Sequence, residues 1–274
     1  MADIALPQPL AASLGLIEPH AHLLTLPPVG QLLYKVMKVE HLLASIERAY
    51  LHFNRVDSYM DFPDADPHDG QQLPADRAAN AATRFERAPE ITAATYYDQC
   101  RARTYACCFA LENTDHLWQT YGNGGRYGKV GVVFDFQKLR ENLNRHLAPG
   151  QAQFLYQGVA CKQIFSVNYG VVGYVAWDRH RANAEHLPNP IRYTYLKASC
   201  FSVEKELRIS LSAIGIGNFA LNDGRFLDFP TSLPVQFDLR AAIASGAIQK
   251  ILLSPDCDAT FLHAELDRLG TRLP

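Results

Sequence analysis

Basic residues are not in excess in this sequence, and none occurs near its N-terminus. Lysine and arginine number 26 against 28 aspartates and glutamates, so the net charge of -2 lacks the basic footprint that duplex nucleic acid requires. No Lys or Arg precedes Lys35, which argues against the charged start of a secretory signal, and no apolar run approaches the roughly 20 residues of a membrane span. We therefore expect a cytoplasmic protein with no membrane contact and no dedicated binding to duplex DNA.

Metal and nucleophile motifs are also missing. The six cysteines include no C-x-x-C pair and no short metal-ligand spacing, so we interpret them as reduced core residues and expect no metal. No Gly-x-Ser-x-Gly elbow supports a hydrolase nucleophile. The glycines within residues 122–128 lack the spacing and the lysine of a phosphate loop, which favours a helix end followed by a turn.

Length and patterning indicate one main domain. With 274 residues and 48% hydrophobic composition, the chain can bury a sizeable core. Residues 1–30 form a proline-punctuated arm, residues 31–274 are expected to form a single compact α+β domain, and a polar excursion interrupts it at about 61–90. Strands cluster and do not alternate regularly with helices, which favours a mixed, mostly antiparallel sheet flanked by helices.

The domain opens with a strand, a helix and a second strand. Residues 32–36 read as the first strand, apolar residues at helical spacing follow over residues 39–50, and residues 50–53 read as the second strand. A later strand is expected around Glu206. We expect the strands that contain Tyr34 and Glu206 to belong to one sheet, or to facing halves of a split sheet.

Segment 201–210 carries the most distinctive side chains. Alternate residues of a strand share a face, so Glu204, Glu206 and Arg208 are expected on one face and apolar residues on the other. Two carboxylates this close raise the proton affinity of one of them, and Arg208 partly offsets that rise. The pair could supply a tuned acid or an anchor for a cationic intermediate. An ordinary Glu–Arg ion pair on a solvated strand face explains the same pattern.

Trp118 and Tyr121 lie three residues apart in an expected short helix over residues 114–121. That spacing places both side chains on one side of the helix. Packing in the core and stacking on a ligand both account for such a pair. We expect Trp118 at least to be largely buried.

Motifs in a consistent order along the chain suggest a family. They include Leu33-Tyr34-Lys35, Cys108-Phe109, Leu117-Trp118-Gln-Thr-Tyr121-Gly122, Gly131-Val-Val-Phe134-Asp135, and then Lys197, Phe201, Glu204, Glu206 and Arg208. Together they resemble the bacterial proteins grouped as domain of unknown function 2971, over roughly residues 32–269. The chain departs from that family at Phe201, where Trp is frequent, and at residues 54–57, where a tight Asn-Asp-Pro cluster is frequent. The family implies no settled activity.

A second resemblance concerns activity. The opening strand with Tyr34-Lys35 and the helix and strand after it look like the entry of NAD-consuming ADP-ribosyltransferases, and Glu204-Lys-Glu206 looks like their late Glu-x-Glu strand. This resemblance implies that Glu206 is the catalytic carboxylate, that Glu204 assists the acceptor, and that NAD is the co-substrate. Cleavage of the nicotinamide bond leaves an oxocarbenium-like ribose, which a nearby carboxylate stabilises. The acceptor would be a protein or a nucleic acid.

The same resemblance implies which residues would contact NAD. Lys35 would meet a phosphate or a ribose hydroxyl, and Trp118 or Tyr121 would stack on the nicotinamide ring. The full set implied to bind the cofactor is Tyr34, Lys35, Trp118, Tyr121 and Arg208.

Two other classes of function stay open. A metal-dependent nuclease or phosphodiesterase could use the carboxylates of Asp57, Asp61, Glu204 and Glu206 as oxygen ligands. A non-catalytic sensor or interaction module, for example in phage defence, would need the same carboxylates only for structure. Binding of NAD with release of nicotinamide would favour the transferase, and binding of a metal would favour the nuclease.

Overall fold

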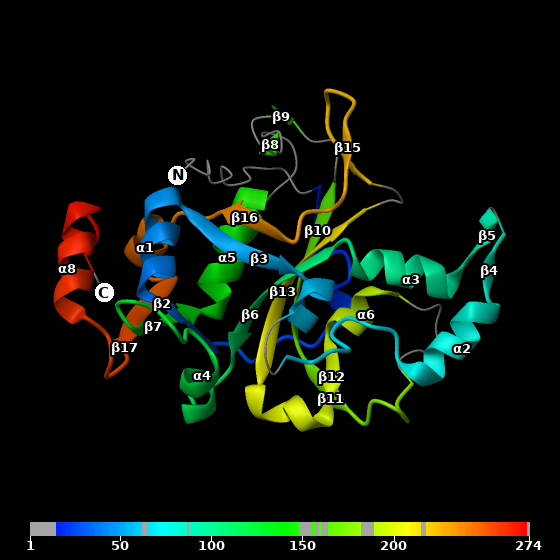
Figure 1. The fold of residues 1–274 in the computed structure, drawn as a ribbon, viewed down its shortest axis with the longest axis horizontal. Helices are drawn as coiled ribbons and strands as arrows, with labels where there is room; N and C mark the ends of the chain where they lie inside the picture. The colour runs from blue at the N-terminus through cyan, green and yellow to red at the C-terminus, as the bar shows by residue number, and fades with distance from the viewer. Residues whose placement is uncertain are drawn as a thin grey trace.

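The computed structural model describes residues 15–61, 65–86, 88–147, 155–156, 159–160, 164–181, 189–214 and 218–272. Within these residues the chain folds into an α+β structure around one sheet of nine strands (Figure 1). The strand order is β1-β10-β13-β6-β2-β7-β17, and β3 joins β6 beside β2 and carries β16 on its outer edge. Only β1 and β10 pair in parallel within this sheet. The predicted mixed, mostly antiparallel sheet is therefore confirmed.

The strands of the main sheet are β1 (Gly15–Ile17), β2 (Leu32–Lys38), β3 (Tyr50–Arg55), β6 (Thr104–Ala110), β7 (Lys129–Asp135), β10 (Phe165–Val171), β13 (Glu206–Ala213), β16 (Ser232–Gln236) and β17 (Ile248–Leu253). Four small two-stranded sheets accompany them: β4 (Arg84–Phe85) with β5 (Ala88–Thr92), β8 (Leu155–Tyr156) with β9 (Val159–Ala160), β11 (Gly173–Val175) with β12 (Leu196–Ala198), and β14 (Phe219–Ala220) with β15 (Phe226–Leu227).

The helices are α1 (Val39–Arg48), α2 (Pro74–Ala82), α3 (Ala93–Arg101), α4 (Asp115–Thr120), α5 (Phe136–Leu147), α6 (Ile191–Thr194), α7 (Leu239–Ala244) and α8 (Ala259–Arg268), with short 3-10 turns η1 (Ala21–Leu23), η2 (Val56–Asp61) and η3 (Ser199–Glu204). Side-chain oxygens cap the first turns of α3, α4, α5, α7 and α8, because Thr92, Thr114, Asp135, Asp238 and Asp258 accept hydrogen bonds from backbone N–H groups. Figure 1 shows α1 and α8 at one end of the sheet and α2 and α3 at the other.

The sheet splits at β6. Strand β2 pairs with β6 through Tyr34 and Ala110, whereas β3 pairs with the earlier part of β6, at Tyr105 and Ala106. Helix α1 connects the two diverging strands. Between the two pairings, the carbonyl oxygen of Cys108 accepts a hydrogen bond of 2.9 Å from Lys35 Nζ. The expectation that the strands of Tyr34 and Glu206 share a sheet is confirmed, and so is the split.

One face of the sheet carries the main core. Alternate residues of β6 and β13 point into it, and they pack with leucines and isoleucines of α1, α5, α7 and α8. The strand residues of this core include Tyr105, Cys107, Phe109, Leu207, Ile209 and Leu211. The intervening residues Glu206, Arg208 and Ser210 therefore point to the opposite face, where they are nevertheless buried. Alternation predicted this division of β13 correctly.

One expectation about local structure was wrong. Glu204 does not lie on a strand: it ends the 3-10 turn η3, and Lys205 at φ 43° precedes the first strand residue, Glu206. Residues 15–17, within the segment expected to form a proline-punctuated arm, form the short strand β1, which pairs with β10.

No helix in the described part of the chain is both long enough and apolar enough to cross a membrane.

Candidate functional site

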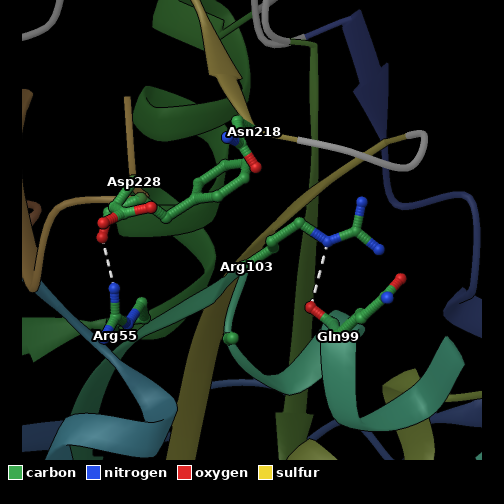
Figure 2. A pocket seen from close by; sticks show the side chains of 7 residues that line it. Arg55, Gln99, Arg103, Asn218 and Asp228 are labelled. Carbon is green, nitrogen blue, oxygen red and sulfur yellow. Dashed lines mark hydrogen bonds between the residues drawn. The ribbon is translucent and has the colours of Figure 1, made fainter. Parts of the chain in front are cut away.

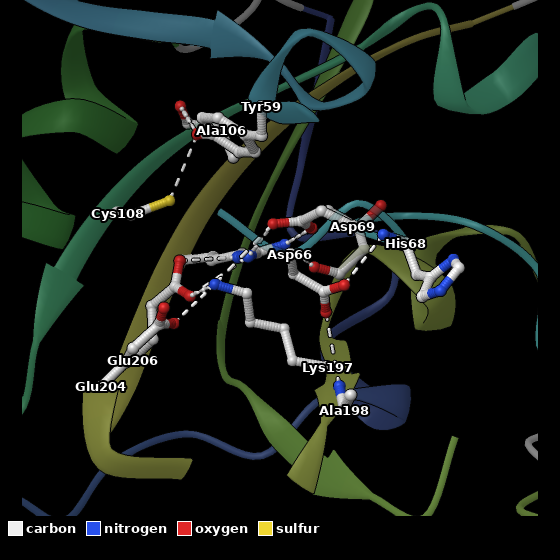
Figure 3. Close-up of polar contacts among 12 residues, drawn as sticks. Tyr59, Asp66, His68, Asp69, Ala106, Cys108, Lys197, Ala198, Glu204 and Glu206 are labelled. Carbon is white, nitrogen blue, oxygen red and sulfur yellow. Dashed lines mark hydrogen bonds and ion pairs between the residues drawn. The ribbon is translucent and has the colours of Figure 1, made fainter. Parts of the chain in front are cut away.

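Six charged side chains gather on the face of β13 opposite the main core, and we call them the charge cluster. They come from segment 65–72 and from β12, η3 and β13, and Figure 3 shows Lys197 pointing toward Glu204 and Glu206. Exposure of the five side chains in ion pairs ranges only from 0% to 10%, so water screens their interactions little. The members of the charge cluster are Asp66, Asp69, Lys197, Glu204, Glu206 and Arg208.

Arg208 lies at the centre of the charge cluster and is fully buried. Its Nε donates to Glu206 Oε1 at 2.7 Å, and its Nη2 donates to Asp69 Oδ2 at 2.7 Å. Nη1 donates to Asp69 Oδ1 and, at 2.7 Å, to the carbonyl oxygen of Thr194. The guanidinium thus binds Asp69 through both carboxylate oxygens, which is the strong, orientation-specific form of this pair.

Segment 65–72 brings Asp69 across the sheet. Gly70 makes this approach possible: its φ is 68°, and a Cβ there would lie 2.5 Å from Val56 Cγ1. The carbonyl oxygen of Asp69 accepts from Arg101 Nε at 2.7 Å, and Asp66 Oδ2 accepts from the backbone N–H of Ala198 at 3.4 Å. The segment is therefore attached to both α3 and β12.

Lys197 joins three carboxylates. Its Nζ lies 2.5 Å from Glu204 Oε2, 3.2 Å from Glu206 Oε2 and 3.9 Å from Asp69 Oδ2. The left-handed conformation of Lys205 turns the chain between the two glutamates, so both can reach one ammonium although they do not lie on one strand. The sequence correctly predicted that Glu204, Glu206 and Arg208 come together. Strand alternation explains the contact between Glu206 and Arg208, whereas the turn at Lys205 brings in Glu204.

The two glutamates differ in proton affinity. Burial raises the pKa of Glu206, but the charges of Arg208 and Lys197 and hydrogen bonds from Arg208 and Cys108 lower it by more, so its pKa lies well below the usual range. Burial also raises the pKa of Glu204, where Lys197 opposes the rise and the charge of Glu206 adds to it, and the result is a raised pKa. Glu206 is therefore a fixed anion, whereas Glu204 is the carboxyl that can take up or release a proton.

Cys108 adds a neutral donor beside Glu206. Burial and the charge of Glu206 raise the pKa of the Cys108 thiol well above its usual value, and the thiol hydrogen-bonds the Glu206 carboxylate. Tyr59 supports the thiol from the other side, with its hydroxyl 3.2 Å from Cys108 Sγ and donating to the carbonyl oxygen of Ala106 at 2.9 Å. Because the thiol stays protonated, Cys108 serves as a hydrogen-bond donor and is not a nucleophile.

Aromatic residues surround Glu204. Tyr121 is 42% exposed, and burial together with the charges of Glu204 and Glu206 raises its pKa. The hydroxyl of Tyr174 accepts from the backbone N–H of Glu206 at 2.9 Å, and the ring of Phe201 lies with its centroid 5.5 Å from Lys197 Nζ. The carboxylates are thus bordered by rings that could stack on a planar group.

Trp118 and Tyr121 do not share a helix face. Tyr121 follows α4 in an extended conformation, so its side chain leaves the helix. Trp118 is half-buried and packs on Gly131, where a Cβ would lie 2.8 Å from its ring, and its Nε1 donates to Asn113 at 2.7 Å. The expectation that Trp118 is largely buried is thus met in part, because the residue is covered on one side but is not fully buried. Trp118 belongs to a small apolar group with Tyr34, Val36, Ala110 and Leu117.

Lys35 is not brought to the charge cluster. It alternates with Tyr34 along β2 and thus points to the other face, where its Nζ also lies 5.1 Å from the ring centroid of Phe109. Tyr34, in contrast, lies on the face of Glu206. The role in binding NAD implied for Lys35 receives no support from its position.

Two depressions open in the described surface. One, of about 310 Å³, is lined by residues 176–179 and 198–200 and borders the charge cluster at Ala198. The other, of about 390 Å³, is lined by Arg55, Arg103 and Asp228 among others and lies at the far end of β6 (Figure 2). Arg55 there is paired with Asp57 at 2.6 Å, so Asp57 is engaged away from the two glutamates.

No metal-ligand group is assembled among the described residues. No three His, Cys, Asp or Glu side chains within them are arranged to hold an ion. The side chain of Asp61, which the nuclease hypothesis also required, lies outside the described residues. The described residues therefore provide no set of metal ligands that would support the nuclease hypothesis.

Sequence reasoning assigned no role to Asp66, Asp69, Lys197 or Tyr174. Asp69 and Arg208 are 139 residues apart, so no local pattern links them. Lys197 was part of the family resemblance, which was the one signal that could have marked it.

Comparison with known proteins adds no relative: no family model matches the chain, and neither a curated protein nor a solved structure matches it.

Proposed function

We propose that the protein is an NAD-consuming enzyme of the ADP-ribosyltransferase type and that the charge cluster is its catalytic centre. The observation that carries the proposal is the pair of glutamates on Lys197, one with a pKa well below its usual range and one with a raised pKa, on the face of the sheet opposite the main core. Pairs of carboxyl groups with diverging proton affinities divide the work of glycosidic bond cleavage between a fixed charge and a proton acceptor.

Glu206 supplies the fixed charge. When the bond between ribose and nicotinamide breaks, the bonding electrons leave with neutral nicotinamide and positive charge develops on the ribose. A carboxylate that stays ionised and is held by Arg208 and Lys197 offers a preorganised negative charge to that cation. Because these ion pairs hold the Glu206 carboxylate in place, it does not have to reorient as positive charge develops on the ribose.

Glu204 supplies the proton acceptor. It lies at the end of η3 with 10% of its side chain exposed, beside the exposed Tyr121. An acceptor hydroxyl, amine or amide that attacks the ribose must lose a proton, and a carboxyl with raised pKa is suited to take it. Tyr121 would stack on the nicotinamide ring in this arrangement.

The test measures nicotinamide release from millimolar NAD with panels of protein and nucleic-acid acceptors. Glu206→Gln should lower release by roughly 10²-fold or more while keeping the fold, because it removes the charge and keeps the shape. Glu112→Gln is the matched control: Glu112 pairs with Lys205 on the surface, with 54% exposure, and its loss should leave release unchanged. Absence of NAD binding by the wild-type protein would refute the proposal.

A second candidate is a non-catalytic NAD-binding module. It is favoured by the fact that both oxygens of Glu206 already accept hydrogen bonds from cations. Such a protein would bind NAD and release no nicotinamide with any acceptor, and Glu206→Gln would change its stability alone.

A further inference from the structure

We infer that Lys197 is a positioning residue for Glu204: it holds that carboxylate within the charge cluster as its counter-ion. The inference rests on the proposed function for its catalytic meaning, but its physical content concerns the two side chains alone. It starts from the ion pair of 2.5 Å between Lys197 Nζ and Glu204 Oε2.

Lys197 is the one cation within ion-pair distance of Glu204 among the residues that the structure describes. Glu206 and Asp69, in contrast, are both bound by Arg208 as well as by Lys197. Removing the ammonium would therefore leave Glu206 and Asp69 with a counter-ion and Glu204 with none at that distance.

The remaining neighbours of Glu204 do not replace Lys197. Glu206 on β13 is a like charge, and Arg208 on the same strand contributes a weaker attraction than Lys197 does. Tyr121, after α4, and Tyr174, on β11, both have raised pKa values, mainly because of burial, and stay neutral near pH 7. The carboxylate of Glu206 disfavours a negative charge on Glu204 once the ammonium is gone.

Lys197 is itself held in place. Its side chain is 7% exposed, it lies on β12 beside β11, and its ammonium also lies 5.5 Å from the ring centroid of Phe201. Lys197 keeps its proton. Burial lowers its pKa, but the neighbouring carboxylates raise it by more, so the pKa of the ammonium is raised overall. Because Lys197 is held in this way, its ammonium can fix the position of the Glu204 carboxylate.

The primary test follows the carboxyl carbon of Glu204 by NMR in protein labelled with ¹³C-glutamate, with Glu204→Gln used for assignment. In Lys197→Met the protonation midpoint of Glu204 should rise by about one pH unit or more, the scale on which a nearby opposite charge acts. Lys197→Arg should bring the midpoint back toward the wild-type value. Lys205→Met is the matched control, because Lys205 pairs with Glu112 on the surface, and it should leave the midpoint unchanged.

A measurement on the unsubstituted chain covers the case in which Lys197→Met does not fold. The ¹⁵Nζ signal of Lys197 should move with the same midpoint as the Glu204 carboxyl signal, and Glu204→Gln should abolish that movement. Independent midpoints, or an unchanged Glu204 midpoint in folded Lys197→Met, would overturn the inference.

Activity separates this inference from the proposed function. If wild type releases nicotinamide, the acid limb of its pH–rate profile should move to higher pH in Lys197→Met with little change in KM for NAD. If wild type releases none but the NMR midpoints shift as stated, the proposed function fails and the positioning role stands. If release occurs and the acid limb stays in place, the positioning role fails.

Discussion

Tyr34 and Glu206 lie in line across three strands, because each is paired in register with Ala110, Tyr34 from β2 and Glu206 from β13. Side chains of residues paired in this way point to the same face of a sheet. The small apolar group that contains Tyr34 and the charge cluster that contains Glu206 are therefore neighbouring parts of one face of the sheet. Only the small side chain of Ala110 stands between these two positions on the strands.

Asp69→Asn should be strongly destabilising. It leaves Arg208 fully buried with one of its two carboxylate partners gone, and breaking a buried pair costs about 3–5 kcal/mol of unfolding free energy. Urea unfolding near neutral pH measures the loss. Glu112→Gln, which breaks an exposed pair, should cost less than about 1 kcal/mol, and equal losses in both variants would contradict the burial argument.

Gly70→Ala should destabilise more than Gly224→Ala. Both glycines have positive φ, 68° and 89°, so both substitutions carry the backbone strain of about 1 kcal/mol or more. At Gly70 the new Cβ would also lie 2.5 Å from Val56 Cγ1, whereas at Gly224 nothing lies within 4 Å. Thermal unfolding of the two variants side by side reports the difference. Identical midpoints would show that segment 65–72 can shift without cost.

Glu206 should contribute to stability in a pH-dependent way. Burial raises its pKa, but Arg208 and Lys197 lower it more, so the carboxyl binds fewer protons in the folded than in the unfolded state. Its contribution is complete above the unfolded-state pKa near about 4.3 and is lost as the pH falls through the folded-state value. Below about pH 4.3, unfolding free energy should therefore fall more steeply in wild type than in Glu206→Gln. Parallel curves from urea unfolding would argue against an ionised Glu206.

Trp118→Ala should cost roughly 1–3 kcal/mol, less than the about 3–5 kcal/mol typical of a fully buried Trp or Phe. The reason is that Trp118 is half-buried and packs one side of its ring on Gly131. Urea unfolding gives the value. Gly131→Ala offers a check, because its Cβ would lie 2.8 Å from the ring and should displace it, with a matching change in tryptophan fluorescence. An unperturbed spectrum would show that the ring is not seated on Gly131.

Much of the sheet could be predicted from the sequence, because alternation on a strand is a local property. The alternation in residues 206–211 correctly separates Arg208 from the core residues Leu207 and Ile209. The prediction that the alternation continues back to Glu204 was wrong. Nothing in the local sequence pattern indicates that Lys205 adopts the left-handed conformation. Lysine rarely adopts that conformation, so the turn follows from tertiary contacts and not from propensity.

The candidate site was only half predictable. Glu206 and Arg208 are two residues apart and their contact follows from strand geometry, whereas Asp69 reaches them from another segment of the chain. Segment 61–90 was interpreted as a polar excursion on composition. One of its aspartates, Asp69, is buried against Arg208 and Lys197, and composition cannot distinguish such a residue from one exposed to water.

The side chains in the split of the sheet also cover part of an otherwise unpaired strand edge. Between its pairings with β2 and β3, strand β6 directs the carbonyl oxygens of Ala106 and Cys108 toward a gap, and the hydroxyl of Tyr59 and the ammonium of Lys35 bind them. An unpaired strand edge is a template onto which a foreign strand can add, and a lysine placed there opposes such addition. Lys35→Ala should therefore increase the tendency of the protein to aggregate on mild heating, through strand invasion at β6.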